Sequence, residues 1–166
     1  LHYPLRRQRQ MCIETAGTIT GTADITVAGS ITLVAGMTYT HTGTVTVTDT
    51  ATITTAGKTF SGLTVDGTGI TVTLGDALNT STRILTVTRG TFDTANFNVT
   101  TGSLVSNNSN TRTINLGSST LNAAFGPVTF TTSTNLTFNA GTSQITTDTS
   151  NPCLLYTSDA ADEEDS

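Results

Sequence analysis

The chain of 166 residues contains no tryptophan, and only 5% of its residues are aromatic and 11% charged. Its two cysteines, Cys12 and Cys153, lie near the two ends, so the body of the chain has no thiols for a disulfide framework or a thiolate metal site. No apolar run approaches the roughly 18 residues that a membrane-spanning helix needs. These absences exclude a disulfide scaffold, a cysteine-ligated metal domain and a helical membrane span within this sequence.

Both ends of the chain resemble translated sequencing-adapter sequence. Residues 153–163 match one reading frame of a common transposon-type sequencing adapter, and residues 6–13 match the opposite strand of the same adapter. Segments of this origin are not part of a protein's native fold. We therefore interpret residues 1–15 and 153–166 as non-native tails without core contacts, and residues 16–152 as a fragment of a longer protein. Both cysteines belong to the tails.

The charge of residues 16–152 is close to neutral. The segment contains no glutamate, and its four cations and six aspartates give a net charge of −2. The cations are Lys58, Arg83, Arg89 and Arg112, and the aspartates are Asp24, Asp49, Asp66, Asp76, Asp93 and Asp148. Four scattered cations do not form the basic surface that binds nucleic acid, so we expect no nucleic-acid partner.

Threonine dominates the segment, which holds every threonine of the chain except Thr15 and Thr157. Threonine is β-branched and suits a pleated, half-exposed surface. It alternates with valine, isoleucine and leucine in runs such as residues 44–48 and 69–74. Alternation with period two places apolar side chains on one face of a strand and hydroxyls on the other. The segment is therefore predicted to be all-β.

A short unit, apolar–Thr/Asn–apolar, recurs along the segment with turn-forming glycines between its copies. Alternate copies begin at Ile25, Val45 and Leu63, with uneven spacing. A period of roughly 20 residues with two or three strands per period indicates stacked coils. We predict a parallel β-solenoid of about six or seven irregular rungs, roughly 30 Å long at the usual strand spacing. The uneven spacing leaves a β-sandwich as the alternative.

The alternation also predicts which side chains form the core. The inward set is Ile25, Ile31, Val45, Val47, Leu63, Val65, Ile70, Val72, Leu85, Val87, Ile114, Leu116, Val128, Phe130, Leu136 and Phe138. The interleaved outward set is Thr26, Thr46, Thr64, Thr71, Thr86 and Thr129. The opposite register would bury hydroxyls in a narrow core, where each needs a hydrogen-bond partner.

The repeat pattern resembles the Thr/Gly/Asn-rich repeat regions of bacteriophage tail and fibre proteins and of bacterial surface adhesins. Residues 112–121 and 135–145 carry this resemblance, which extends over most of the segment. It implies a right-handed parallel β-helix or related solenoid with a structural or receptor-contacting role. It also implies an extracellular, cell-surface or virion location.

No arrangement of residues in the sequence predicts catalysis. Asp66 and Asp76 are the closest aspartates able to lie on one face of successive strands, as a glycosidase carboxylate pair would, but each is better explained as a turn residue. Residues 66–69 resemble a calcium-binding turn only faintly. His41 is expected at the surface, and no serine or threonine has a recognisable activating base. We therefore expect no enzyme activity, no cofactor and no metal.

The most suggestive feature is a hydroxyl array that places threonine at every second position. We take Thr38, Thr40, Thr42, Thr44, Thr46 and Thr48 as the candidate ligand-binding or ice-binding face. The array looks like the ranked threonines of several ice-binding solenoids. To match the ice lattice, the threonines of successive rungs must align in columns. The uneven spacing of the repeats is expected to disturb that alignment.

Three functions follow from these observations. The first is a structural or adhesive repeat module of a phage tail fibre or bacterial surface protein, which binds a cell-surface glycan or protein receptor through an extended β face. The second is an ice-binding solenoid, and the third a polysaccharide-degrading β-helix. In the first case we also expect self-association through the solenoid ends, or a trimer in the parent protein, because uncapped end strands pair with other strands.

Overall fold

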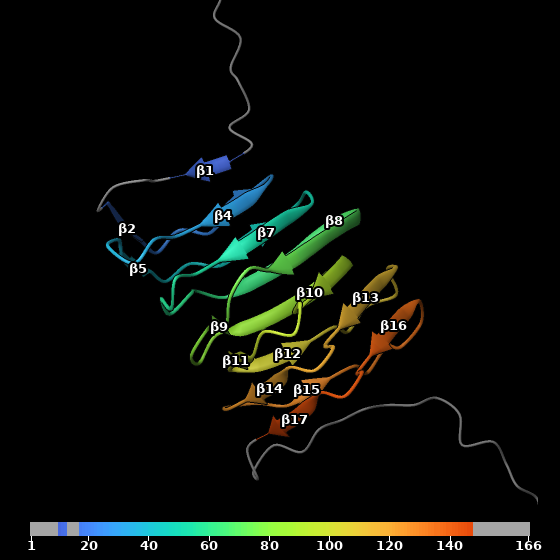
Figure 1. The fold of residues 1–166 in the computed structure, drawn as a ribbon. Coiled ribbons are helices and arrows are strands. Elements are labelled where there is room, and N and C mark those ends of the chain that lie inside the picture. The colour runs from blue at the N-terminus through green and yellow to red at the C-terminus, as the bar shows by residue number, and fades with distance from the viewer. Residues whose placement is uncertain (1–9, 13–16, 148–166) are drawn as a thin grey trace, which may run out of the picture.

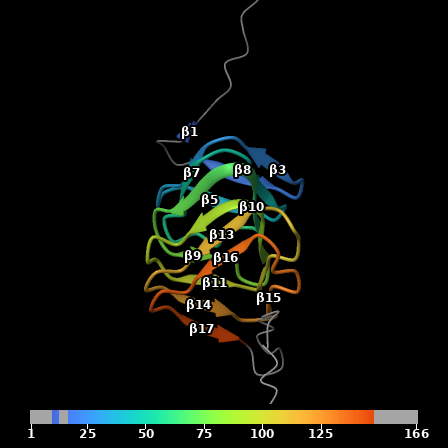
Figure 2. The same cartoon turned by 90° about the vertical axis from the view of Figure 1, so that its right-hand side faces the viewer.

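The structure is a computed structural model that describes residues 10–12 and 17–147, and every regular element in these residues is a β-strand. The strands stack in parallel into a β-solenoid of about six turns (Figure 1), which confirms the predicted fold class. The view turned by 90° shows the same stack running from β1 to β17 (Figure 2). In the described residues, no helix has the length and apolar character needed to cross a membrane.

The strands of the solenoid lie on three faces, the third of which is interrupted between β5 and β9, where Thr59 forms an isolated bridge with Asn79. The first face consists of β3 (Ile25–Val27), β6 (Val45–Val47), the first parts of β8 (Leu63–Leu74) and β10 (Ile84–Asp93), β12 (Ser103–Val105) and β15 (Val128–Thr129). The second face consists of β1 (Gln10–Cys12), β4 (Ser30–Thr32), β7 (Ala51–Thr54), the later parts of β8 and β10, β13 (Arg112–Asn115) and β16 (Leu136–Asn139). The third face consists of β2 (Thr18–Gly21), β5 (Thr38–His41), β9 (Leu78–Asn79), β11 (Val99–Thr101), β14 (Thr120–Ala123) and β17 (Gln144–Thr147).

The core is built from inward columns, in which each apolar residue lies directly over one in the next turn. One column on the first face runs Ile25, Val45, Leu63, Leu85, Leu104, Val128. One on the second face runs Ala51, Val72, Phe92, Ile114, Phe138. Burying one such Val, Leu, Ile or Phe side chain stabilises a fold by about 1.5–3 kcal/mol, so the columns are the main source of stability.

The predicted division into inward and outward residues is confirmed. The predicted core residues from Ile31 to Phe130 are all buried, whereas Ile25, Leu136 and Phe138 are half-buried in the first and last turns. The six threonines predicted to point outward are all half-buried or exposed. The prediction of which residues point inward is correct because successive side chains of a strand point to opposite faces, whatever strands are stacked on it.

Unequal turns nevertheless keep their strands in register within each face, although the pairing of β8 with β10 shifts at the corner between Val87 and Thr91. The turn from Val45 to its partner Leu63 is shorter than the turn from Leu104 to its partner Val128. The additional residues lie in the corners between faces, such as residues 107–111 and 131–135. The expectation that uneven spacing disturbs the alignment of ranks is therefore wrong for these paired strands, because corners absorb the difference.

The two tails fall largely outside the described residues. Of residues 1–15, the structure describes only Gln10–Cys12, whose backbone forms β1 and pairs with β4. Residues 153–166 are not among those described. The interpretation of both tails as non-native therefore stays a prediction.

Two glycines with similar backbone conformations test how tightly the corners are packed. Gly90 has φ +88°, and a Cβ added there would lie 2.6 Å from the Gly67 carbonyl oxygen and 2.8 Å from the Ile70 side chain. Gly57 has φ +72° and open space around the same position. We expect Gly90→Ala to lower the free energy of unfolding by about 2–4 kcal/mol, since backbone strain and overpacking add.

Gly57→Ala is the matched control, because it adds strain without a clash. It should cost only about 1 kcal/mol. Urea unfolding of both variants measures the difference between them. Equal losses would show that the Gly90 corner opens to admit a methyl group.

Candidate functional site

The six threonines predicted as a ligand-binding face do not form one row in the structure. Thr38 and Thr40 lie on β5 of the third face, and Thr46 lies on β6 of the first face. Thr42 and Thr44 occupy the corner between these two faces, and Thr48 follows β6. Alternation along the chain carries the six residues around the solenoid, so they are not presented together to one flat ligand.

The rows that do form run across turns. On the first face, outward threonines align as Thr26, Thr46, Thr64, Thr86. On the second face, one row is Thr71, Thr91, Thr113, Thr137, and the next is Thr52, Thr73, Asp93, Asn115, Asn139. Side-chain hydrogen bonds link the last three residues, with Asn115 donating to Asp93 at 3.3 Å and Asn139 donating to Asn115 at 2.7 Å. Sequence reasoning missed these rows, because they depend on the length of each turn.

A groove marks the corner where the third face meets the first, and we call it the corner groove. Its larger lobe, of about 350 Å³, is lined by Thr44, Gly62, Thr64, Ile84 and Thr86. Its smaller lobe, of about 180 Å³, has His41 and Ser61 in its wall. Thr42, Thr82 and Arg83 line both lobes. Thr42 and Thr44, two of the predicted residues, thus meet residues from later turns here.

The expectation that His41 lies at the surface is wrong. His41 is only 7% exposed, because it points inward at the end of β5. Its Nε2 lies 2.8 Å from the Ala23 carbonyl oxygen and its Nδ1 lies 3.2 Å from Ser61 Oγ. The Tyr39 hydroxyl lies 2.8 Å from the same Ser61 oxygen. Burial raises the pKa of Tyr39, which keeps its hydroxyl protonated and available for this network.

The Ser61–His41 contact places a potential base beside a serine hydroxyl, a pairing that the sequence did not predict. Because a carbonyl only accepts, the Nε2 that faces Ala23 carries the ring proton, and Nδ1 is left to accept from Ser61. This is the pairing from which serine nucleophiles are built. However, Ser61 is only 3% exposed and shares its hydroxyl with Tyr39. Its clear role is to satisfy buried polar groups beneath the corner groove.

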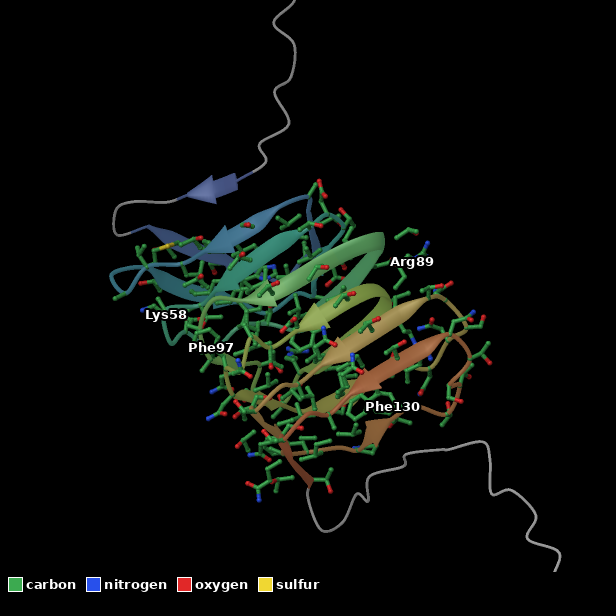
Figure 3. All side chains as sticks on the ribbon, turned by 45° about the vertical axis from the view of Figure 1, so that its right-hand side comes forward. Lys58, Arg89, Phe97 and Phe130 are labelled. Carbon is green, nitrogen blue, oxygen red and sulfur yellow. The ribbon has the colours of Figure 1, made fainter. Side chains whose placement is uncertain are left out.

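A second hollow lies at the corner between the first and second faces. It has a volume of about 410 Å³ and is lined by residues that include Thr91, Thr113, Arg89 and Arg112. Arg89 forms an ion pair with Asp66, with Nε and Oδ1 2.6 Å apart. This ion pair compensates the charge of Arg89. Figure 3 shows Arg89 at one lateral edge of the stack and Lys58 at the opposite edge.

Arg112 is the largest fully buried side chain of the core, although its guanidinium carries a charge. Its Nε donates to Ser106 Oγ at 2.6 Å. The two terminal nitrogens donate to the carbonyl oxygens of Ser106, Asn110, Thr132 and Thr134. Burial lowers the pKa of Arg112. All five bonds go to groups of two corner loops, so this arginine joins the loops and is not free to bind a ligand.

Asp66 and Asp76 do not form a carboxylate pair. Asp66 lies at the corner between the first and second faces, where it pairs with Arg89. Asp76 lies beyond the end of β8, where its carboxylate accepts hydrogen bonds from the backbone nitrogens of Thr55 and Ala56 in the preceding turn. Across the described part of the chain, no three residues of the types His, Cys, Asp and Glu come together as a metal site would require.

Comparison of the chain with protein-family models, with curated proteins and with solved structures gave no match.

The five bonds of Arg112 predict a large cost for a conservative substitution. Arg112→Lys keeps the charge but cannot reach the carbonyls of both loops at once. Since each buried acceptor left unpaired costs about 1–3 kcal/mol, we expect the free energy of unfolding to fall by about 2–4 kcal/mol. Arg89→Lys should change it by less than about 1 kcal/mol, because exposed ion pairs contribute little. Chemical denaturation of both variants measures the two values, and a loss of similar size in Arg89→Lys would contradict this assignment.

Proposed function

We propose that the chain is a structural and adhesive module of a virion or cell-surface protein, which binds a surface glycan through its first face. The observation that carries this proposal is the in-register row Thr26, Thr46, Thr64, Thr86, which runs beside the corner groove. Hydroxyls at the regular strand spacing offer donors and acceptors to a repeating ligand. The groove provides a concave surface that the outward rows alone lack.

The proposal does not include catalysis. The aspartates are placed singly, and Asp24, Asp49, Asp76 and Asp93 each accept a hydrogen bond from a backbone N–H group. A glycosidase needs two carboxyl groups about 5–10 Å apart across the bond that it cleaves. We therefore propose binding without cleavage, and release of reducing sugar from a bound polysaccharide would contradict it.

An ice-binding function is the second candidate, and one observation favours it. On the second face, Thr52 and Thr73 are paired in register. Two positions before them, the Thr71 backbone nitrogen donates a hydrogen bond to Thr50 Oγ1 at 3.3 Å. The row of Thr71 continues through Thr91, Thr113 and Thr137. The row of Thr52 and Thr73 changes to Asp93, Asn115 and Asn139, which interrupts the hydroxyl pattern along half of the face.

Retention on immobilised bacterial surface polysaccharides, both neutral and acidic, tests the adhesive function. We expect the chain to be retained by at least one of them. The double substitution Thr64→Tyr/Thr86→Tyr fills the larger lobe of the corner groove, while tyrosine remains a favourable strand residue. It should weaken retention by at least ~10-fold, as expected when roughly 1.4 kcal/mol of binding free energy is lost.

The control is Thr91→Tyr/Thr113→Tyr, which fills the second hollow in the same way and should leave retention unchanged. If only this control weakened retention, the ligand would bind the second face. If no polysaccharide retained the unaltered chain, the adhesive function would be wrong.

Thermal hysteresis tests the second candidate. If the chain binds ice, it depresses the freezing point below the melting point, and Thr71→Lys should abolish the effect because a long charged side chain lifts the ice surface from the second face. Under the adhesive function we expect no hysteresis in the unaltered chain. A measurable gap that is lost in Thr71→Lys would replace the first proposal by the second.

A further inference from the structure

Arg83 is the one cation in the described residues whose side chain has no partner. Arg89 is paired with Asp66, and Arg112 is fully bonded within the core. Lys58 donates its Nζ to the Ala35 carbonyl oxygen at 2.7 Å. The guanidinium of Arg83 is exposed and forms no hydrogen bond or ion pair with any described residue. An uncompensated charge is thus placed in the corner groove.

Hydrogen bonds from buried threonines and from a neighbouring backbone nitrogen hold the backbone of Arg83 in place. Its carbonyl oxygen accepts hydrogen bonds from Thr80 Oγ1 at 2.9 Å and from Thr101 Oγ1 at 3.0 Å. The backbone nitrogen of Gly102 donates to the same oxygen at 2.8 Å. Thr80 and Thr101 are completely buried. The side chain of Arg83 therefore extends from a fixed backbone, so no backbone segment has to be ordered when a ligand binds it.

The shape of the groove follows from a short turn. The turn from Val45 to Leu63 is shorter than the turns on either side of it, and Gly62 lies between Thr44 of the turn before and Ile84 of the turn after. A Cβ at Gly62 would lie 3.3 Å from the Ile84 carbonyl oxygen and 3.7 Å from Thr44 Oγ1. The neighbouring turns thus pack closely around Gly62, and the larger lobe of the groove lies over this corner, with Gly62 in its floor.

The groove combines three kinds of surface within one recess. Arg83 supplies a cationic fork that matches a carboxylate in two parallel hydrogen bonds. Hydroxyls come from Thr42, Thr44 and the row on the first face. The side chain of Ile84, which is 50% exposed, supplies an apolar wall. No aspartate lines either lobe, and Asp24 accepts a hydrogen bond from the backbone nitrogen of the groove residue Thr44 at 2.7 Å.

From this combination we infer that the corner groove binds a carboxylated sugar, such as a uronic acid residue of an acidic polysaccharide. The carboxylate pairs with Arg83, the sugar hydroxyls bond to the threonines, and the C–H face of the ring lies on Ile84. The inference rests on the proposed adhesive function and assigns a ligand class to the same groove.

The experiment compares acidic oligosaccharides with matched uncharged forms by calorimetric titration of the full chain. The probes are an oligogalacturonate with its methyl ester, and a glucuronate-containing hyaluronan oligosaccharide with its carboxyl-reduced form. We expect one or both acids to bind at least ~10-fold more tightly than the uncharged form, as for a hydrogen bond to a charged group. Raising the salt concentration should weaken this binding, because an exposed ion pair is screened.

Arg83→Gln removes the charge while keeping a polar side chain at an exposed position, so the fold is expected to persist. It should weaken binding of the acid by about 10- to 100-fold and leave binding of the uncharged form unchanged. Arg89→Gln is the matched control, since it removes an exposed arginine from the second hollow, and it should change the affinity by less than about twofold.

Three results would overturn the inference: neither acid binds, acid and uncharged form bind equally, or Arg83→Gln binds as well as the unaltered chain. Each of these results would reject the inference of an acidic ligand. The adhesive function would still stand if neutral polysaccharides retained the unaltered chain and if Thr64→Tyr/Thr86→Tyr weakened that retention. Loss of retention on every polysaccharide removes the adhesive function as well.

Discussion

The structure depends on one constraint: strands form their backbone hydrogen bonds with strands of the neighbouring turns. A slip of one residue would turn an entire inward row toward solvent and bury hydroxyls. The register is therefore kept even where turns differ in length, as between Val45 and Leu63 or between Leu104 and Val128. Inward columns of apolar residues and outward rows of threonine both result from this register. The chemistry of each face is then repeated at the strand spacing along the stack.

The corners carry the differences between turns, and they hold most of the polar interactions that are not strand pairing. Asp24, Asp76 and Asn98 each accept a backbone N–H from a neighbouring turn. Buried backbone groups must be paired, and at a corner a side chain takes the place of the missing strand. Arg112 donates hydrogen bonds to two corner loops in this way, and Arg89 forms an ion pair with Asp66. Both arginine side chains therefore have partners within the fold. Arg83 differs, because only its backbone is used.

The fold class and the core could be predicted from the sequence because period-two alternation is read within a single strand. The composition of a row could not be predicted, because a row joins residues from successive turns of unequal length and a single miscounted corner changes its members. This is why the sequence groups the threonines between Thr38 and Thr48, although they follow one turn around two faces. The burial of His41 had a usable signal, since Tyr39 and His41 occupy the inward phase of the strand. The burial of Arg112 had the same signal, because it lies two residues before Ile114.

The same variation in turn length that the corners absorb also determines where the surface is concave. A solenoid with equal turns presents flat rows, which suit a flat repeating ligand such as an ice lattice. Where a short turn lies between two longer ones, its corner lies deeper than theirs and the surface is concave. Gly62 is at such a corner, and it lines the groove together with Thr44 of the turn before and Ile84 of the turn after. The strand register still holds there, because the inward neighbours Leu63 and Val65 continue their columns. A solenoid can thus acquire a binding groove by changing the length and residues of a corner, while the columns that stabilise it remain unchanged.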